Sequence, residues 1–192
     1  MDKKREDLYI DELKTQVDFA LFSIKNINFF LEQMDDGKAG GSDNFWYYAQ
    51  NLVVYSGNIS KILWGVKDRN KSKNSIRKKE RQELRGKLKI ENDSLLKNRS
   101  LRNALEHIDE KLEEFTDNEN NIIFNKNIFT LIEECKFEEG SYRLSKEKNL
   151  RHYDPITKTF YFYGEKVNLQ DLYRSINLLK KNISEYKNQT VR

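Results

Sequence analysis

Three polar residues with complementary chemistry, Arg102, Asn103 and His107, lie within the stretch LRNALEHIDEKLEEF, which runs from Leu101 to Phe115. Histidine can take and give a proton near neutral pH, and arginine stays cationic and forks onto phosphate oxygens. These residue types suit the attack of a ribose 2′-hydroxyl on its neighbouring phosphate, a reaction that needs no metal ion. The amide of Asn103 lies one helical turn before His107, where it would orient the imidazole.

The order arginine, polar residue, three further residues and histidine, here RNALEH, resembles the motif of the HEPN superfamily, as does the predicted helical layout. Members of that superfamily are typically metal-independent endoribonucleases, many of them toxins or abortive-infection factors, and others are inactive RNA-binding or scaffold modules. The resemblance implies that Arg102 holds the scissile phosphate, that His107 acts as general base or acid at the 2′-hydroxyl, and that Asn103 positions His107. It also implies a site formed at a dimer interface.

The predicted helix that carries this motif leads to the same expectation of a dimer. Its apolar residues recur at steps of three and four and form one stripe: Leu101, Leu105, Ile108, Leu112 and Phe115. At about 100° per residue, Arg102 and His107 lie about 140° apart around the axis of an ideal helix. One copy cannot easily aim both at one phosphate, so we expect a homodimer in which two half-sites face each other.

The acidic residues around the motif favour a different interpretation. Glu106, Asp109, Glu110, Glu113 and Glu114 share its polar face, and this negative charge would repel RNA. Arg102 would then pair with Glu106, and His107 would belong to an ion-pair network. On that interpretation the protein is a non-catalytic helical protein-binding or RNA-binding module.

A basic segment from Lys67 to Lys89 holds eleven Lys and Arg residues against three acidic ones, although the net charge of the whole chain is +4. A local charge of this size attracts phosphate backbones. We therefore predict that RNA binds to a short basic helix spanning about 76–88, with nucleic-acid-binding side chains at Arg77, Lys78, Arg81 and Arg85. The alternative is a solvated, lysine-rich face without a partner.

Apolar periodicity predicts long helices that position these residues, and the single proline and eight glycines offer few interruptions. We expect a mainly α protein, an up-and-down bundle of four long helices plus the short basic helix. The expected long helices span about 8–34, 45–66, 94–115 and 169–186. A β-hairpin is predicted at 149–164, with its turn at Asp154 and Pro155, whereas 122–137 fits a strand or a helical turn equally well. All 192 residues are expected to form one domain.

The remaining features narrow the expected partners and environment. No apolar run is long enough to span a membrane, and the lone Cys135 fits a reducing compartment as a core thiol, so we expect a cytoplasmic protein that contacts no membrane. No metal or cofactor motif is present, so none is expected to bind. His152 is expected at a turn or exposed, and the two tryptophans in the core. The extra phenylalanines of the first helix, Phe19, Phe22, Phe29 and Phe30, imply a second packing surface. It lies either in the same core or against an antitoxin or another protein partner.

Overall fold

The computed structural model describes residues 1–35, 41–66, 70–116, 125–128, 135–137, 140–142 and 150–190 of the chain. The protein is mainly helical, as the sequence predicts, and it has a small four-stranded sheet. Its three longest helices are α1 (Lys3–Asp35), α2 (Gly41–Trp64) and α6 (Leu169–Thr190). No helix of the described chain is long and apolar enough to cross a membrane.

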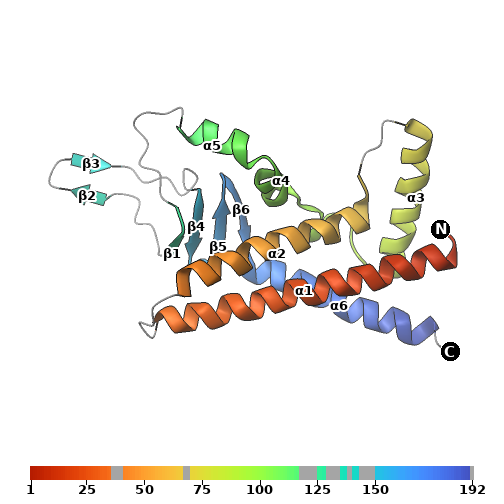
Figure 1. Ribbon diagram of the computed structural model, residues 1–192. Helices are drawn as coiled ribbons and strands as arrows, with labels where there is room; N and C mark the ends of the chain where they lie inside the picture. The colour runs from red at the N-terminus through yellow and green to blue at the C-terminus, as the bar shows by residue number, and fades with distance from the viewer. Residues whose placement is uncertain are drawn as a thin grey trace.

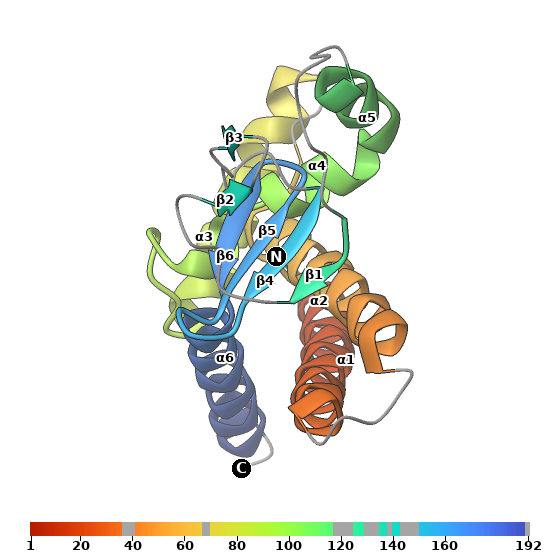
Figure 2. The ribbon, with the colours of Figure 1, turned by 90° about the vertical axis from the view of Figure 1, so that its left-hand side faces the viewer.

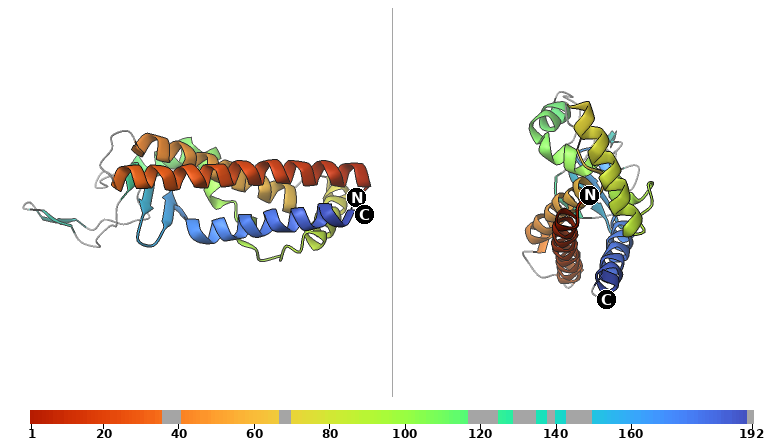
Figure 3. Two further views of the ribbon diagram at one scale, coloured as in Figure 1. Left: turned by 90° about the horizontal axis from the view of Figure 1, so that it is seen from below. Right: turned by 90° about the vertical axis from the view of Figure 1, so that its right-hand side faces the viewer.

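The helices α1 and α2 form an antiparallel pair, and α6 packs along α1 (Figure 1). The predicted stripe of α1 is buried in this packing, since Ile10, Leu13 and Val17 are each at most 1% exposed. Its apolar residues share one core with α2, α6 and the sheet, where Phe45 and Trp46 of α2 pack on Phe160. The start of α1 and the end of α6 lie at the same end of the molecule (Figure 3).

The sheet stands at the other end, above the start of α2 (Figures 1 and 2), and its core is the predicted hairpin. Strands β4 (Arg151–Asp154) and β5 (Thr159–Phe162) pair antiparallel, and Asp154 Oδ1 accepts hydrogen bonds from the Ile156 and Thr157 N–H groups in the turn. The hairpin is extended on both sides by strands that the sequence did not define. These are β6 (Glu165–Asn168), antiparallel to β5, and β1 (Asn127–Ile128), parallel to β4.

A second, two-stranded sheet forms from β2 (Cys135–Phe137) and β3 (Gly140–Tyr142). The Cys135 side chain, and most of the ambiguous stretch 122–137, fall outside the described residues. The expectation for His152 was wrong: its side chain is fully buried in β4, 5.6 Å from the Tyr161 ring. The pairing of β4 with β5 places this residue within the sheet, and an interpretation centred on the turn at Asp154 and Pro155 did not anticipate this.

The basic helix α3 (Lys71–Lys87) begins earlier than predicted, because the Asn70 side chain caps the N–H groups of Ser72 and Lys73. It stands at an angle beside the start of α1 (Figure 1). Leu84 and Leu88 are fully buried, while Ile76 stays 57% exposed. The helix is therefore anchored by its C-terminal half.

The motif stretch does not form the single long helix that was predicted. It divides into α4 (Ser100–Glu106) and α5 (Ile108–Thr116), with His107 at φ −109° and ψ 42° between them; the 3₁₀ helix η1 (Leu95–Lys97) precedes α4. The physical reason is uneven burial: α4 packs on α2, β5 and β6, whereas Ile108 and Leu112 of α5 keep 37% and 39% of their surface exposed. A bundle of four long helices is thus not confirmed.

Candidate functional site at the bend between α4 and α5

Arg102 lies along α2, where a glycine makes room for it. A Cβ atom added to Gly57 would lie 1.9 Å from Arg102 Cδ and 2.9 Å from Arg102 Cβ, so the aliphatic part of the arginine occupies that space. The side chain is 13% exposed, and its guanidinium donates to Glu106 Oε2 at 2.5 Å. Lys61 of α2 also lies 3.7 Å from Glu106. Arg102 is therefore a positioned, partly buried cation at the edge of the molecular surface.

His107 sits at the bend itself, and its side chain is 61% exposed. Its Nδ1 lies 3.3 Å from Glu110 Oε1, and when Nδ1 carries the proton it donates to that carboxylate. In that tautomer Nε2 keeps its lone pair and is the ring nitrogen that can accept a proton. An exposed, carboxylate-oriented imidazole is an arrangement suited to general acid–base chemistry.

The sequence suggested that the Asn103 side chain orients His107, but the structure shows no such contact. Asn103 is exposed on α4, and the bond between the two residues joins the His107 N–H to the Asn103 carbonyl oxygen at 3.0 Å. Glu110 takes the orienting position instead. The sequence carries this signal as a histidine and a glutamate three residues apart at the start of a helix.

The structure brings Arg102 and His107 to the two sides of one bend but not into contact. Each pairs with a carboxylate on its own short segment, Glu106 for the arginine and Glu110 for the histidine. This is the ion-pair network that the sequence allowed as an alternative.

Two of the four basic residues predicted to bind nucleic acid have structural contacts instead. Arg85 is 8% exposed, and its guanidinium donates to the Leu63 carbonyl oxygen at 2.6 Å and to Asn92 Oδ1 at 3.2 Å. Burial lowers the pKa of this guanidinium. Arg81 stacks its guanidinium 3.7 Å from the centre of the Tyr9 ring. Arg77 and Lys78 are exposed, as nucleic-acid binding would require.

A cavity of about 730 Å³ collects residues that sequence reasoning did not connect. It lies between the end of α2, α3 and the segment before α4, and we call it the cationic cavity, lined among others by Trp64, Arg77, Lys78, Arg85, Lys97 and Arg99. The Arg99 guanidinium donates to the carbonyl oxygens of Ser60 and Gly65 at 3.1 and 2.7 Å. Burial, and secondarily the charge of Arg102, lower the pKa of Arg99. No local pattern reveals this cavity, because its walls are far apart in the chain.

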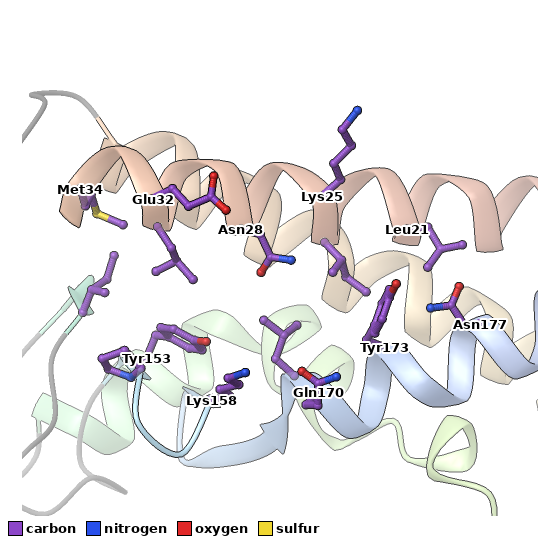
Figure 4. A pocket seen from close by; sticks show the side chains of 15 residues that line it. Leu21, Lys25, Asn28, Glu32, Met34, Tyr153, Lys158, Gln170, Tyr173 and Asn177 are labelled. Atoms are coloured by element: carbon purple, nitrogen blue, oxygen red, sulfur yellow. The ribbon is translucent and has the colours of Figure 1, made fainter. Parts of the chain in front are cut away.

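A larger cavity, of about 1020 Å³, lies between α1, α6 and the turn of the hairpin. Figure 4 shows Asn28 of α1 across from Gln170 and Tyr173 of α6, with Lys25 pointing away. None of the predicted site residues lines it. Among the described residues, no group of three or more His, Cys, Asp or Glu side chains is arranged to hold a metal ion.

In comparisons with protein-family models, curated proteins and solved structures, no match to this chain was found.

Proposed function

We propose that this protein is a metal-independent endoribonuclease of HEPN type that acts as a homodimer, with a role as a toxin or defence factor. The observation that carries the proposal is the bend at His107. There an exposed imidazole with a carboxylate on Nδ1 lies five residues after a partly buried arginine held against Gly57. This combination provides a proton acceptor and a phosphate-binding cation on one surface.

In the proposed reaction, His107 Nε2 removes the proton from a ribose 2′-hydroxyl. The resulting oxygen attacks the neighbouring phosphorus, the bond to the 5′-oxygen of the next nucleotide breaks, and that oxygen leaves as a hydroxyl after it takes up a proton. The products are a 2′,3′-cyclic phosphate and a 5′-hydroxyl end. The guanidinium of Arg102 offsets the negative charge that develops on the phosphate oxygens. To do so it must exchange Glu106 for the phosphate.

A second copy of the chain would complete the site. The α4–α5 segment lies on the side of the molecule opposite α1 and α6 (Figures 1 and 2), where a partner would meet no long helix first. Ile108, directly after His107, is 37% exposed and adds apolar surface there. In a HEPN-like bundle, α4 and α5 together would take the place of the fourth helix.

The direct test is incubation of the purified protein with single-stranded and structured RNA in the presence of EDTA. We expect cleavage by the wild type, loss of cleavage in His107→Ala, and little change in Asp109→Ala. Asp109 is the matched control because it is an exposed residue at the start of α5, two positions after His107. Cleavage that continues unchanged in His107→Ala would rule out the role assigned to His107.

One observation favours a second candidate function, a non-catalytic protein-binding module. An aromatic row runs over α1 and α2, and it includes exposed Phe19, Phe22, Phe29 and Tyr47 at 47–62% exposure. Neighbouring rings join it through contacts such as Phe22–Tyr48 at 6.0 Å. The binding function is supported by three results together. The wild type cleaves no RNA, the Arg102→Ala, His107→Ala double variant still binds a cellular partner, and the Phe22→Ser variant loses that partner.

A further inference from the structure

The cationic cavity has a composition unusual for a structural crevice. Five of its lining residues are cationic, and none of the described residues that line it is acidic. Arginine and lysine are normally balanced by nearby carboxylates when they gather in a partly buried position. The two arginines of the cavity whose hydrogen bonds are seen, Arg85 and Arg99, bind neutral oxygens instead.

Part of this charge has a structural explanation. Arg85 and Arg99 both bind carbonyl oxygens at the C-terminal end of α2, and a helix end carries about half a negative unit charge. That partial charge offsets only a share of the charge of Arg85 and Arg99, and it leaves the exposed Lys78 and Lys97 beside it. In addition, Arg85 Nε is buried and has no hydrogen-bond acceptor among the described residues. The cavity therefore favours an anion.

The cavity also has an aromatic wall and room for a ligand. Trp64 is half-buried there, with the Arg85 guanidinium 5.2 Å from the centre of its ring. Its volume of about 730 Å³ lies within the range of roughly 300–1,000 Å³ that is typical of small-molecule sites. An aromatic surface next to cations suits a nucleotide, whose base stacks on the ring while its phosphate lies on the cations.

The position of the cavity relates it to the motif. Arg99 contacts α2 at Ser60, and Arg102 contacts the same helix one turn earlier, at Gly57. The two guanidinium groups are close enough that the charge of Arg102 lowers the pKa of Arg99. A strand whose phosphate lies at Arg102 would thus pass the mouth of the cavity.

We propose that the cationic cavity binds a nucleotide of the RNA adjacent to the cleaved phosphate, with the base against Trp64 and the phosphate on Lys78, Lys97 and Arg99. This inference rests on the proposed function, because it names the part of the RNA substrate that the chain holds. The sequence predicted that Arg85 contacts nucleic acid at the surface, whereas here Arg85 supports the wall of the cationic cavity.

The test measures binding separately from cleavage. A fluorescently labelled single-stranded RNA is titrated in EDTA against the His107→Ala protein, which should bind without cutting. In that background, Lys78→Gln with Lys97→Gln is compared with Lys73→Gln plus Lys79→Gln. All four lysines are exposed, both pairs remove the same charge, and neither Lys73 nor Lys79 lines the cavity.

We expect the cavity pair to weaken binding roughly tenfold and to lower the slope of log Kd against log salt by about two, one for each phosphate contact. The control pair should change binding far less. Equal weakening by both pairs would mean that the charge acts at long range, and it would overturn the proposal. Melting curves of all variants identify any loss of folding.

Tryptophan fluorescence tests the base contact. RNA should quench the emission of the protein, and the quench should disappear in Trp64→Phe, because Trp46 is buried in the core. Adenosine monophosphate serves as a free-nucleotide probe, and if it quenches Trp64 while RNA does not compete, the RNA assignment fails. If RNA binds through the cavity but the wild type never cleaves, the proposed nuclease function fails and the binding site stands.

Discussion

The side chain of Arg102 occupies the space that a Cβ atom at position 57 would need, so Gly57 and Arg102 fit together across α2 and α4. Glycine in the middle of a helix normally destabilises it by roughly 0.5–1 kcal/mol relative to alanine. At this position the substitution Gly57→Ala should destabilise the protein and not stabilise the helix, because Arg102 and α4 must shift to avoid a 1.9 Å contact.

We therefore expect Gly57→Ala to lower the free energy of unfolding by about 1–3 kcal/mol, as overpacking does. It should also reduce RNA cleavage, since Arg102 leaves its position. Urea unfolding and the cleavage assay measure the two effects. Gly86→Ala in α3 is the control, because a Cβ atom there meets nothing within 4 Å and the helix should become slightly more stable. A stabilised Gly57→Ala protein would contradict the packing.

In the proposed reaction, Glu106 competes with phosphate for Arg102. Its carboxylate accepts from the guanidinium at 2.5 Å, so Glu106→Gln should release the cation and remove a negative charge from the site. We expect RNA to bind roughly three- to tenfold more tightly to this variant, a difference of up to about 1.4 kcal/mol. Fluorescence anisotropy against Asp109→Asn, which removes the same charge from an exposed position on α5, separates this effect from simple charge.

Mixing two inactive variants tests whether the site is shared between copies. Arg102→Ala and His107→Ala each lose one half of the proposed site. If Arg102 of one copy works with His107 of the other, randomly mixed dimers regain about a quarter of the wild-type activity, because half are heterodimers with one intact site in two. Activity of the mixture, with dimers measured by analytical ultracentrifugation, gives the answer. A monomeric active enzyme would exclude the shared site.

Glu6 ties three helices together, and its charge makes stability depend on pH. It is 3% exposed in α1 and accepts hydrogen bonds from Lys87 of α3, at 2.5 Å, and from Tyr186 of α6. Burial alone raises the pKa of this carboxyl group, but the bonds from Lys87 and Tyr186 outweigh it and lower the pKa below its usual value. A depressed folded pKa stabilises the fold above the pKa of the unfolded carboxyl group, and this contribution is lost as pH falls through the folded pKa.

We expect Glu6→Gln to destabilise the protein by about 1–3 kcal/mol at neutral pH. The difference in Tm from the wild type should shrink as the pH falls below 4.5, the usual pKa of a glutamate, because Glu6 itself then becomes protonated. Thermal melting at several pH values measures it. Glu91→Gln, at an exposed position, should leave the Tm nearly unchanged at every pH.

Elements whose stability comes from neighbouring residues were predictable from the sequence. The stripe of α1 is buried as predicted, and the Asp154 turn closes the predicted hairpin. The Asn168 side chain accepts from the Asp171 N–H and so caps the start of α6. Each of these depends on residues within a turn or two of one another, and hydrophobic periodicity and capping record such local preferences directly.

The sequence by itself determined the helical class, the hairpin and the presence of an Arg–His motif in one short segment. The tertiary structure alone decided that the motif helix bends at His107, that Arg85 is buried while Lys78 is exposed, and that Arg99 joins Trp64 in one cavity. The bend depends on which part of 101–115 finds a surface on α2, β5 and β6 to cover. The cavity depends on residues from 64 to 99 meeting across α2 and α3, and no periodicity along the chain encodes such a meeting.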